Sequence, residues 1–126
     1  MNPRSYFLIL TLVAVLLAGV CAAESPLNVA GTWDGSISGR GKLARIIIRV
    51  EQNGEKVSGD YDTIGLRPAA DKVPLEGTII GDQLTLKKRS TGEVRIEATV
   101  ADEKMNGKYY GYFGQSEFFL TAAKIK

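Results

Sequence analysis

The sequence predicts an all-β fold, a small eight-stranded antiparallel up-and-down barrel preceded by a signal peptide. Three observations predict this fold. Apolar and polar residues alternate in segment after segment, and short turns rich in Gly, Asn and Asp separate the segments. No useful length of the chain shows the 3.6-residue period of an amphipathic helix. The third observation is a pattern of apolar residue, any residue, Gly, any residue, apolar residue, which occurs at residues 33–37, 57–61, 75–79 and 105–109.

Glycine stands at the centre of each of these four segments, at Gly35, Gly59, Gly77 and Gly107. Residues i, i+2 and i+4 of a strand share one face, so each glycine should point the same way as its two apolar neighbours. Glycine inside a strand costs roughly 0.5–1 kcal/mol relative to alanine, so four such positions need a structural reason. We expect them to let the strands bend sharply enough for the sheet to close on itself.

The first residues resemble a leader rather than part of the fold. Arg4 gives a basic start, an apolar run follows from Phe7 to Val20, and small residues precede a cleavage site after Ala23. The run is too short for a comfortable membrane span, so no integral membrane association is expected. We therefore predict a signal peptide at 1–23, a linker at 24–29, a barrel domain at 30–126, and a periplasmic or secreted protein.

Composition restricts the classes of function that the protein can have. The only cysteine, Cys21, leaves with the signal peptide unless it is lipidated, an alternative that would anchor the chain as a lipoprotein. Loss of Arg4 leaves 15 basic residues against 14 acidic ones, a balance that argues against nucleic-acid binding. With no histidine and no cysteine in the exported chain, the usual general base, thiol nucleophile and soft metal ligands are missing. We expect no enzyme, no catalytic residue and no cofactor. The carboxylates of Asp60 and Asp62 alone do not predict a metal site.

The first half of the barrel begins with a strand at 30–38, which places Trp33 on the inner face. A strand at 42–52 carries apolar residues at its even positions and mostly charged residues at its odd positions. Asn53-Gly54 is then the strongest short hairpin signal, with positive φ expected at both residues. The strand that follows is expected at 55–62.

The second half begins after the only long connection, at 63–72, where Gly and Pro indicate a loop. Tight turns then separate the remaining strands, and a six- or seven-stranded barrel or a sandwich stays an alternative. We expect these strands at 73–80, 83–89, 93–101, 104–113 and 116–124.

Gly31-Thr32-Trp33, at the head of the first strand, resembles the signature of the calycin superfamily of lipocalins, fatty-acid-binding proteins and avidins. The resemblance implies that Trp33 plugs the closed end and that Lys124 lies across its ring. The segment Ser58-Gly59-Asp60-Tyr61 is also similar to one in avidins. Those proteins need further tryptophans around biotin, and this chain has one, so biotin binding is not expected. The chain looks most like small secreted lipocalin-like barrels of bacteria.

Charge separates the two ends of the predicted barrel. One end gathers 39–41, 63–72, 90–92 and 114–115, whereas the plugged end is acidic. In and beside the turns of the first end, seven basic residues outnumber three acidic ones: Arg40, Lys42, Arg67, Lys72, Lys87, Lys88 and Arg89 against Asp62, Asp71 and Glu93. A basic open end would attract a small amphipathic or anionic ligand, although loop tips are often charged and solvated anyway. Aromatic and aliphatic side chains are numerous enough to fill so narrow a barrel. The residues predicted to bind the ligand are Lys88, Arg40, Arg67, Tyr61, Tyr109 and Phe113.

An alternative function is a filled barrel that works as a protein-interaction or scaffold module. Tyr110, Tyr112 and Phe119 have outward parity on the last two strands and are predicted as a partner surface, for a homodimer or another protein. Stabilisation of the hairpin by cross-strand aromatic pairs explains the same residues equally well. The volume of the interior distinguishes the two functions, because a ligand site needs a cavity of roughly 300 Å³ or more.

Overall fold

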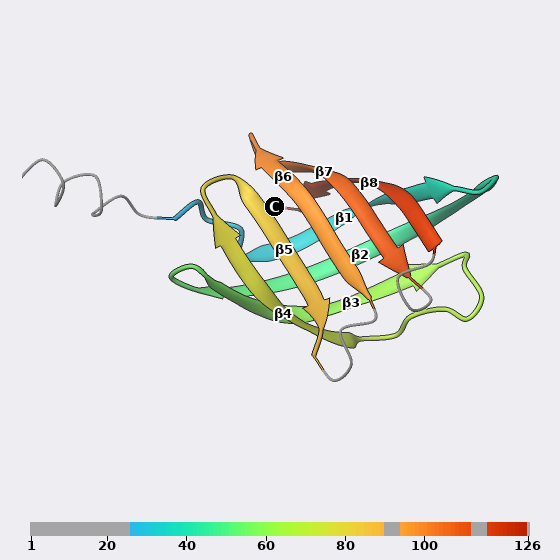
Figure 1. The fold of residues 1–126 in the computed structure, drawn as a ribbon, viewed down its shortest axis with the longest axis horizontal. Helices are drawn as coiled ribbons and strands as arrows, with labels where there is room; N and C mark the ends of the chain where they lie inside the picture. Colours follow the sequence, from blue (N-terminus) through green and yellow to red (C-terminus); the bar gives the residue numbers. More distant parts are fainter. Residues whose placement is uncertain (1–25, 90–93, 112–115, 126) are drawn as a thin grey trace, which may run out of the picture.

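Eight strands form the fold, as the computed structural model shows for residues 26–89, 94–111 and 116–125 (Figure 1). No helix long and apolar enough to cross a membrane occurs among these residues. The predicted signal peptide lies outside the described residues. The strands are β1 (Gly31–Gly39), β2 (Lys42–Asn53), β3 (Lys56–Ile64), β4 (Val73–Ile80), β5 (Gln83–Lys88), β6 (Arg95–Ala101), β7 (Lys104–Gly111) and β8 (Ser116–Lys124).

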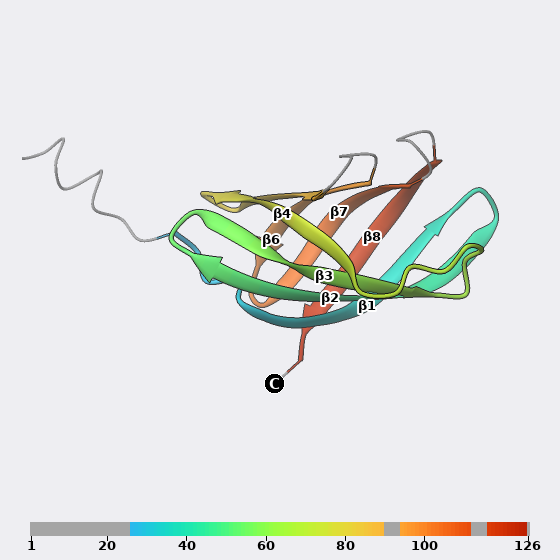
Figure 2. The same ribbon diagram turned by 90° about the horizontal axis from the view of Figure 1, so that it is seen from below.

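The sheet is a closed antiparallel barrel in which every strand pairs with the next and β8 pairs with β1. Figures 1 and 2 show the strands wrapping around one interior, joined mostly by short turns. This confirms the predicted fold class. Closure leaves no open sheet edge, because the backbone groups of β1 and β8 pair with each other. Trp33, for example, lies opposite Lys124.

One turn differs from its prediction. Asn53 pairs with Lys56, so the turn residues between β2 and β3 are Gly54 and Glu55 rather than Asn53 and Gly54. Only Gly54 of these residues has a positive φ, 65°. This is the arrangement of a hairpin turn with glycine at its first position, and Asn53 is left to extend the ladder.

The four pattern glycines share the parity of their buried neighbours, as predicted, and the structure gives a specific reason for them. A Cβ at any of the four would lie only 1.7–2.0 Å from a carbonyl oxygen of the adjacent strand. The backbone of that strand occupies the space a side chain would need, so the strands can approach and bend there only without a Cβ. The carbonyls belong to Thr121 beside Gly35, Arg49 beside Gly59, Thr85 beside Gly77 and Glu97 beside Gly107.

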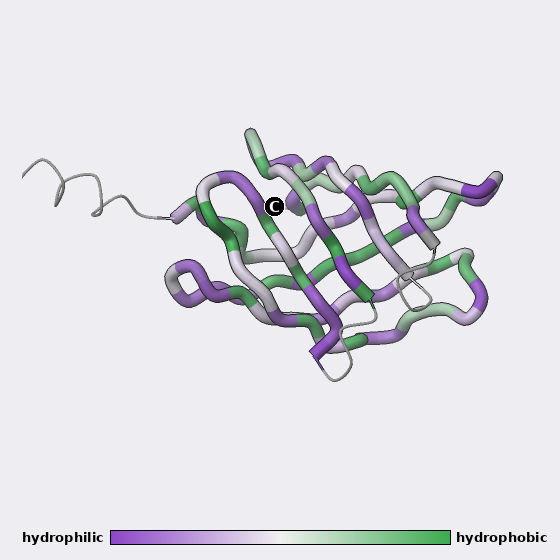
Figure 3. The backbone as a smooth tube through the Cα atoms, in the orientation of Figure 1, coloured by the Kyte–Doolittle hydropathy of each residue, from purple (hydrophilic) through white to green (hydrophobic). Residues whose placement is uncertain are grey.

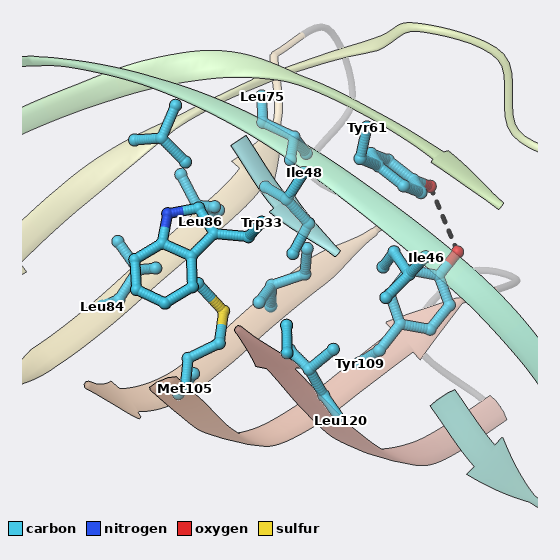
Figure 4. Close-up of a cluster of buried hydrophobic side chains, with 14 of the residues drawn as sticks. Trp33, Ile46, Ile48, Tyr61, Leu75, Leu84, Leu86, Met105, Tyr109 and Leu120 are labelled. Carbon is cyan, nitrogen blue, oxygen red and sulfur yellow. Dashed lines mark hydrogen bonds between the residues drawn. The ribbon is translucent and has the colours of Figure 1, made fainter. Parts of the chain in front are cut away.

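Side chains from all eight strands fill the barrel (Figure 4). Trp33, Leu84, Leu86 and Met105 lie together at one end of this cluster, and Tyr61 and Tyr109 lie at the other. Nearly all inward-facing side chains are buried, which places the core inside the barrel. The predicted alternation of inward and outward residues thus accounts for the core.

Trp33 closes one end of the barrel. Its indole is fully buried, and Nε1 donates a hydrogen bond of 2.9 Å to the carbonyl oxygen of Val29. The Nζ of Lys124 lies 5.5 Å from the centroid of the Trp33 ring, within the range of a cation–π contact. The structure therefore brings the two predicted plug residues together.

Residues 27–29, which we call the strap, cross this closed end. The side chain of Gln52 holds the strap at both ends: its Oε1 accepts the Val29 N–H at 2.7 Å, and its Nε2 donates to the Leu27 carbonyl at 2.8 Å. Val29 is itself fully buried in the core. The end of the predicted linker is thus packed against the barrel.

Candidate functional site

Two tyrosines occupy the interior toward the open end. The hydroxyls of Tyr61 and Tyr109 are hydrogen-bonded at 3.1 Å, and their rings meet edge to face with centroids 5.8 Å apart (Figure 4). Phe118 extends this aromatic layer, its ring centroid 5.9 Å from that of Tyr109. Burial raises the pKa of Tyr61 strongly, and its hydrogen bond to Tyr109 raises it further, so the hydroxyl stays neutral.

The connection between β3 and β4 covers part of the open end. Leu66 is buried in the core although its neighbours in the connection are exposed. Thr63 and Ala70 fasten the base of the connection with two hydrogen bonds, Thr63 N–H to the Ala70 carbonyl at 3.0 Å and Ala70 N–H to Thr63 Oγ1 at 2.8 Å. Asp62 accepts a further bond from the Lys72 N–H. The connection is therefore an ordered element.

We call residues 38–45 and 62–72 the basic lobe. These segments carry five basic side chains against two acidic ones, and they lie side by side at one end of the molecule in both ribbon views (Figures 1 and 2). Figure 3 shows hydrophilic residues at the tip of the β1–β2 hairpin and in the β3–β4 connection. The basic side chains are Arg40, Lys42, Arg45, Arg67 and Lys72.

Ion pairs run across the outer face of β1, β2 and β3, next to the lobe. Arg45 donates to both carboxylate oxygens of Asp34, from Nε at 2.9 Å and from Nη2 at 2.6 Å, and this hydrogen bonding lowers the pKa of Asp34. Arg49 pairs with Asp60 and Asp62 on β3. The Lys72 N–H and Arg49 together lower the pKa of Asp62. Asp62, one of the two acidic residues of the lobe, and Arg45, one of its five basic residues, are therefore both engaged in ion pairs.

The residues predicted to bind a ligand do not come together in one pocket. Arg40 lies in the β1–β2 turn and Arg67 in the β3–β4 connection, both within the basic lobe. Lys88 ends β5, opposite Leu75 of β4, and β5 ends well away from the tip of the β1–β2 hairpin (Figure 1). Tyr61 and Tyr109 are buried beneath the rim. Phe113 lies outside the described residues.

The predicted partner surface is divided. Phe119 points outward and is 68% exposed, but its cross-strand partner is Lys108. Tyr110 lies opposite Glu117, and the guanidinium of Arg95 stacks 4.4 Å from its ring centroid. Tyr112 lies outside the described residues. Tyr110 and Phe119 are thus diagonal neighbours on the outer face, and each lies directly opposite a charged residue.

Two exposed apolar residues of the lobe are not among the residues predicted from the sequence as a site. Leu43 is 72% exposed and Ile64 is 52% exposed, both on the outer face. The outward parity of Leu43 on β2 was a readable signal, because it precedes Arg45 by two residues. Ile64 was assigned to the long connection, whereas β3 continues through it, so its outward direction could not be read.

Three open hollows lie over strands β1 to β4, with volumes of about 610, 480 and 430 Å³. The smallest is lined by Leu43, Ile64 and Arg45 among others. Among the described residues no group of three or more His, Cys, Asp or Glu side chains is placed to hold a metal ion.

Comparisons with protein-family models, with curated proteins and with solved structures find no match to this chain. The eight-stranded antiparallel barrel is therefore the level at which the structure supports the resemblance to calycins. The filled interior and the charged outer surface are the two structural features that bear on the function.

Proposed function

We propose that the protein is an exported, non-catalytic β-barrel that binds an anionic partner on the outside of its basic lobe. The observation that carries the proposal is the gathering of five basic side chains, against two acidic ones, on two segments that lie side by side at one end. Clustered charge of one sign raises the local concentration of a partner of the opposite sign and speeds its association.

The filled interior favours binding on the outside. A ligand in the lumen would have to displace buried side chains such as Tyr61, Tyr109 and Leu120, whose packing stabilises the fold. Phe119 alone gives weaker support to the scaffold alternative, because single exposed apolar residues are normal on protein surfaces.

Retention on a dextran sulfate column tests the proposal. The lobe variant Lys42→Gln plus Lys72→Gln should elute at clearly lower salt than the wild type. The control variant, Lys56→Gln plus Lys104→Gln, removes the same charge from exposed residues beside the turns of the closed end. It should elute close to the wild type, because the position of the charge matters rather than the total. Co-elution of the two variants would show that the basic lobe is not a binding site.

A further inference from the structure

The basic lobe carries apolar side chains among its cations. Leu43 and Arg45 point outward from β2, and Arg45 lies directly opposite Ile64 of β3. Leu43, Arg45 and Ile64 line the same open hollow. More than half of each apolar side chain is exposed. Asp34 lines the same hollow and is ion-paired with Arg45, so the positive charge near these apolar side chains comes from the other cations of the lobe, Arg40, Lys42, Arg67 and Lys72.

The lobe is also held in a fixed shape. The two hydrogen bonds between Thr63 and Ala70 fasten the connection, and Gly65 packs close to Ala44 of β2, so that a Cβ there would lie 3.6 Å from that residue. The hairpin and the connection end the molecule on the same side in Figures 1 and 2. A broad surface can thus reach both segments at once, and little ordering is needed on contact.

We infer that the basic lobe docks on the surface of an anionic lipid bilayer, with Leu43 and Ile64 entering the interface and the surrounding cations meeting the headgroups. This inference rests on the proposed function and names its partner. A soluble polyanion would use the cations but leave both apolar side chains in water, whereas a bilayer interface presents negative charge beside hydrocarbon. An anionic surface repels the acidic turns of the closed end, which carry Asp82, Asp102 and Glu103. The basic lobe therefore faces the bilayer.

The sizes of the effects follow from the chemistry. Removing a leucine side chain from an apolar environment changes a partition coefficient by about tenfold or more. Each cation near an anionic bilayer contributes about a fivefold change. Leu43→Ser should therefore weaken binding to anionic vesicles about tenfold, and Lys42→Gln plus Lys72→Gln about twenty-five-fold. Ile80→Ser, which alters an apolar residue 60% exposed beside the β4–β5 turn at the closed end, should leave binding unchanged.

A fluorescent label on a single cysteine gives the direct test. The test protein is the chain from residue 24, because the closed sheet and its core lie within residues 26–125 and the leader would bind vesicles by itself. This chain lacks Cys21, so Leu43→Cys or Ile80→Cys provides the only thiol for an environment-sensitive dye. Vesicles of equal parts phosphatidylglycerol and phosphatidylcholine should shift the emission of the label at position 43 to shorter wavelength. The label at position 80 should not respond.

Three results would overturn the inference: no shift at position 43 with the anionic vesicles, an equal shift with phosphatidylcholine alone, or equal shifts at positions 43 and 80. The dextran sulfate column separates this failure from that of the proposed function. If the lobe variant still elutes early while vesicles do not bind, the lobe recognises a soluble polyanion or an acidic protein, and only the lipid assignment fails. If the column also shows no difference, both proposals fail.

Discussion

The hydroxyls of Tyr61 and Tyr109 are polar groups in a mainly apolar interior, and each gives the other a hydrogen-bonding partner. A buried hydroxyl without a partner loses its hydration and gains nothing in return, so the bond is a favourable link between β3 and β7 across the interior. Parity correctly predicted that both side chains point inward, but not that their hydroxyls meet. That meeting depends on how eight strands close, which no local pattern records.

Tyr61→Phe should therefore lower the free energy of unfolding by about 1–3 kcal/mol, because Tyr109 loses a buried partner. Tyr110→Phe is the matched control, since it makes the same change one residue from Tyr109 on the outer face and should stay within about 0.5 kcal/mol of the wild type. Urea denaturation of the three proteins measures both effects. Equal stability of Tyr61→Phe and the wild type would mean that the bond does not contribute.

At the scale of the strands, close approach of neighbouring backbones is the feature that allows closure. Gly77→Ala would place a Cβ 1.7 Å from the carbonyl oxygen of Thr85, so β4 and β5 would have to separate. We expect a loss of about 3 kcal/mol, at the upper end of what overpacking causes. Gly41→Asn is the control, because Gly41 has open space around it and a φ of 73° in a hairpin turn, where asparagine is tolerated at a cost below about 1 kcal/mol. Urea denaturation measures the free energy of unfolding of both variants. Equal losses of stability would show that lack of room for a Cβ is not the reason for glycine at position 77.

Strand positions were predictable because each inner face repeats every second residue. The ends were less so: β3 runs through Thr63 and Ile64, which the glycine and proline that follow had suggested as loop. Thr63 stays in the ladder because its hydroxyl and N–H both bond Ala70, seven residues later. The strap was missed for a similar reason, since nothing local to Val29 indicates that Gln52 and Trp33 will hold it.

At the scale of the whole molecule, the basic end was predictable from topology alone. In an up-and-down barrel every second turn lies at the same end, so the charges of those turns can be added together. The shape of that end was not predictable. The five predicted ligand residues that the structure describes share an end of the barrel but lie in the interior, on the lobe and at the end of β5. Chain order gives the end on which a turn lies, whereas the barrel's curvature decides which turns project together. Leu43 and Ile64 became candidates only when that shape was known.

The charge distribution also predicts how stability responds to pH. The chain has no histidine, so stability should change little between about pH 5 and 8. Asp34 and Asp62 have lowered pKa values in the folded state, which stabilises the fold above their unfolded pKa, about 3.9. As pH falls below about 4 and through the folded pKa values, this stabilisation is lost.

Urea denaturation at neutral and acid pH measures this loss. Asp34→Asn plus Asp62→Asn should be less stable than the wild type at neutral pH, and the difference should shrink in acid. A difference of the same size at both pH values would contradict the role assigned to these carboxylates.

The strap and the end of β8 meet at the closed end, where the Ile125 N–H bonds the Thr32 carbonyl at 2.8 Å and Lys124 reaches the strap through Asn28. The described part of the chain thus begins and ends at the pole that Trp33 closes. The opposite pole stays unobstructed. A fusion made directly at Pro26 or Ile125 would therefore leave the cationic tip on the side away from the attachment.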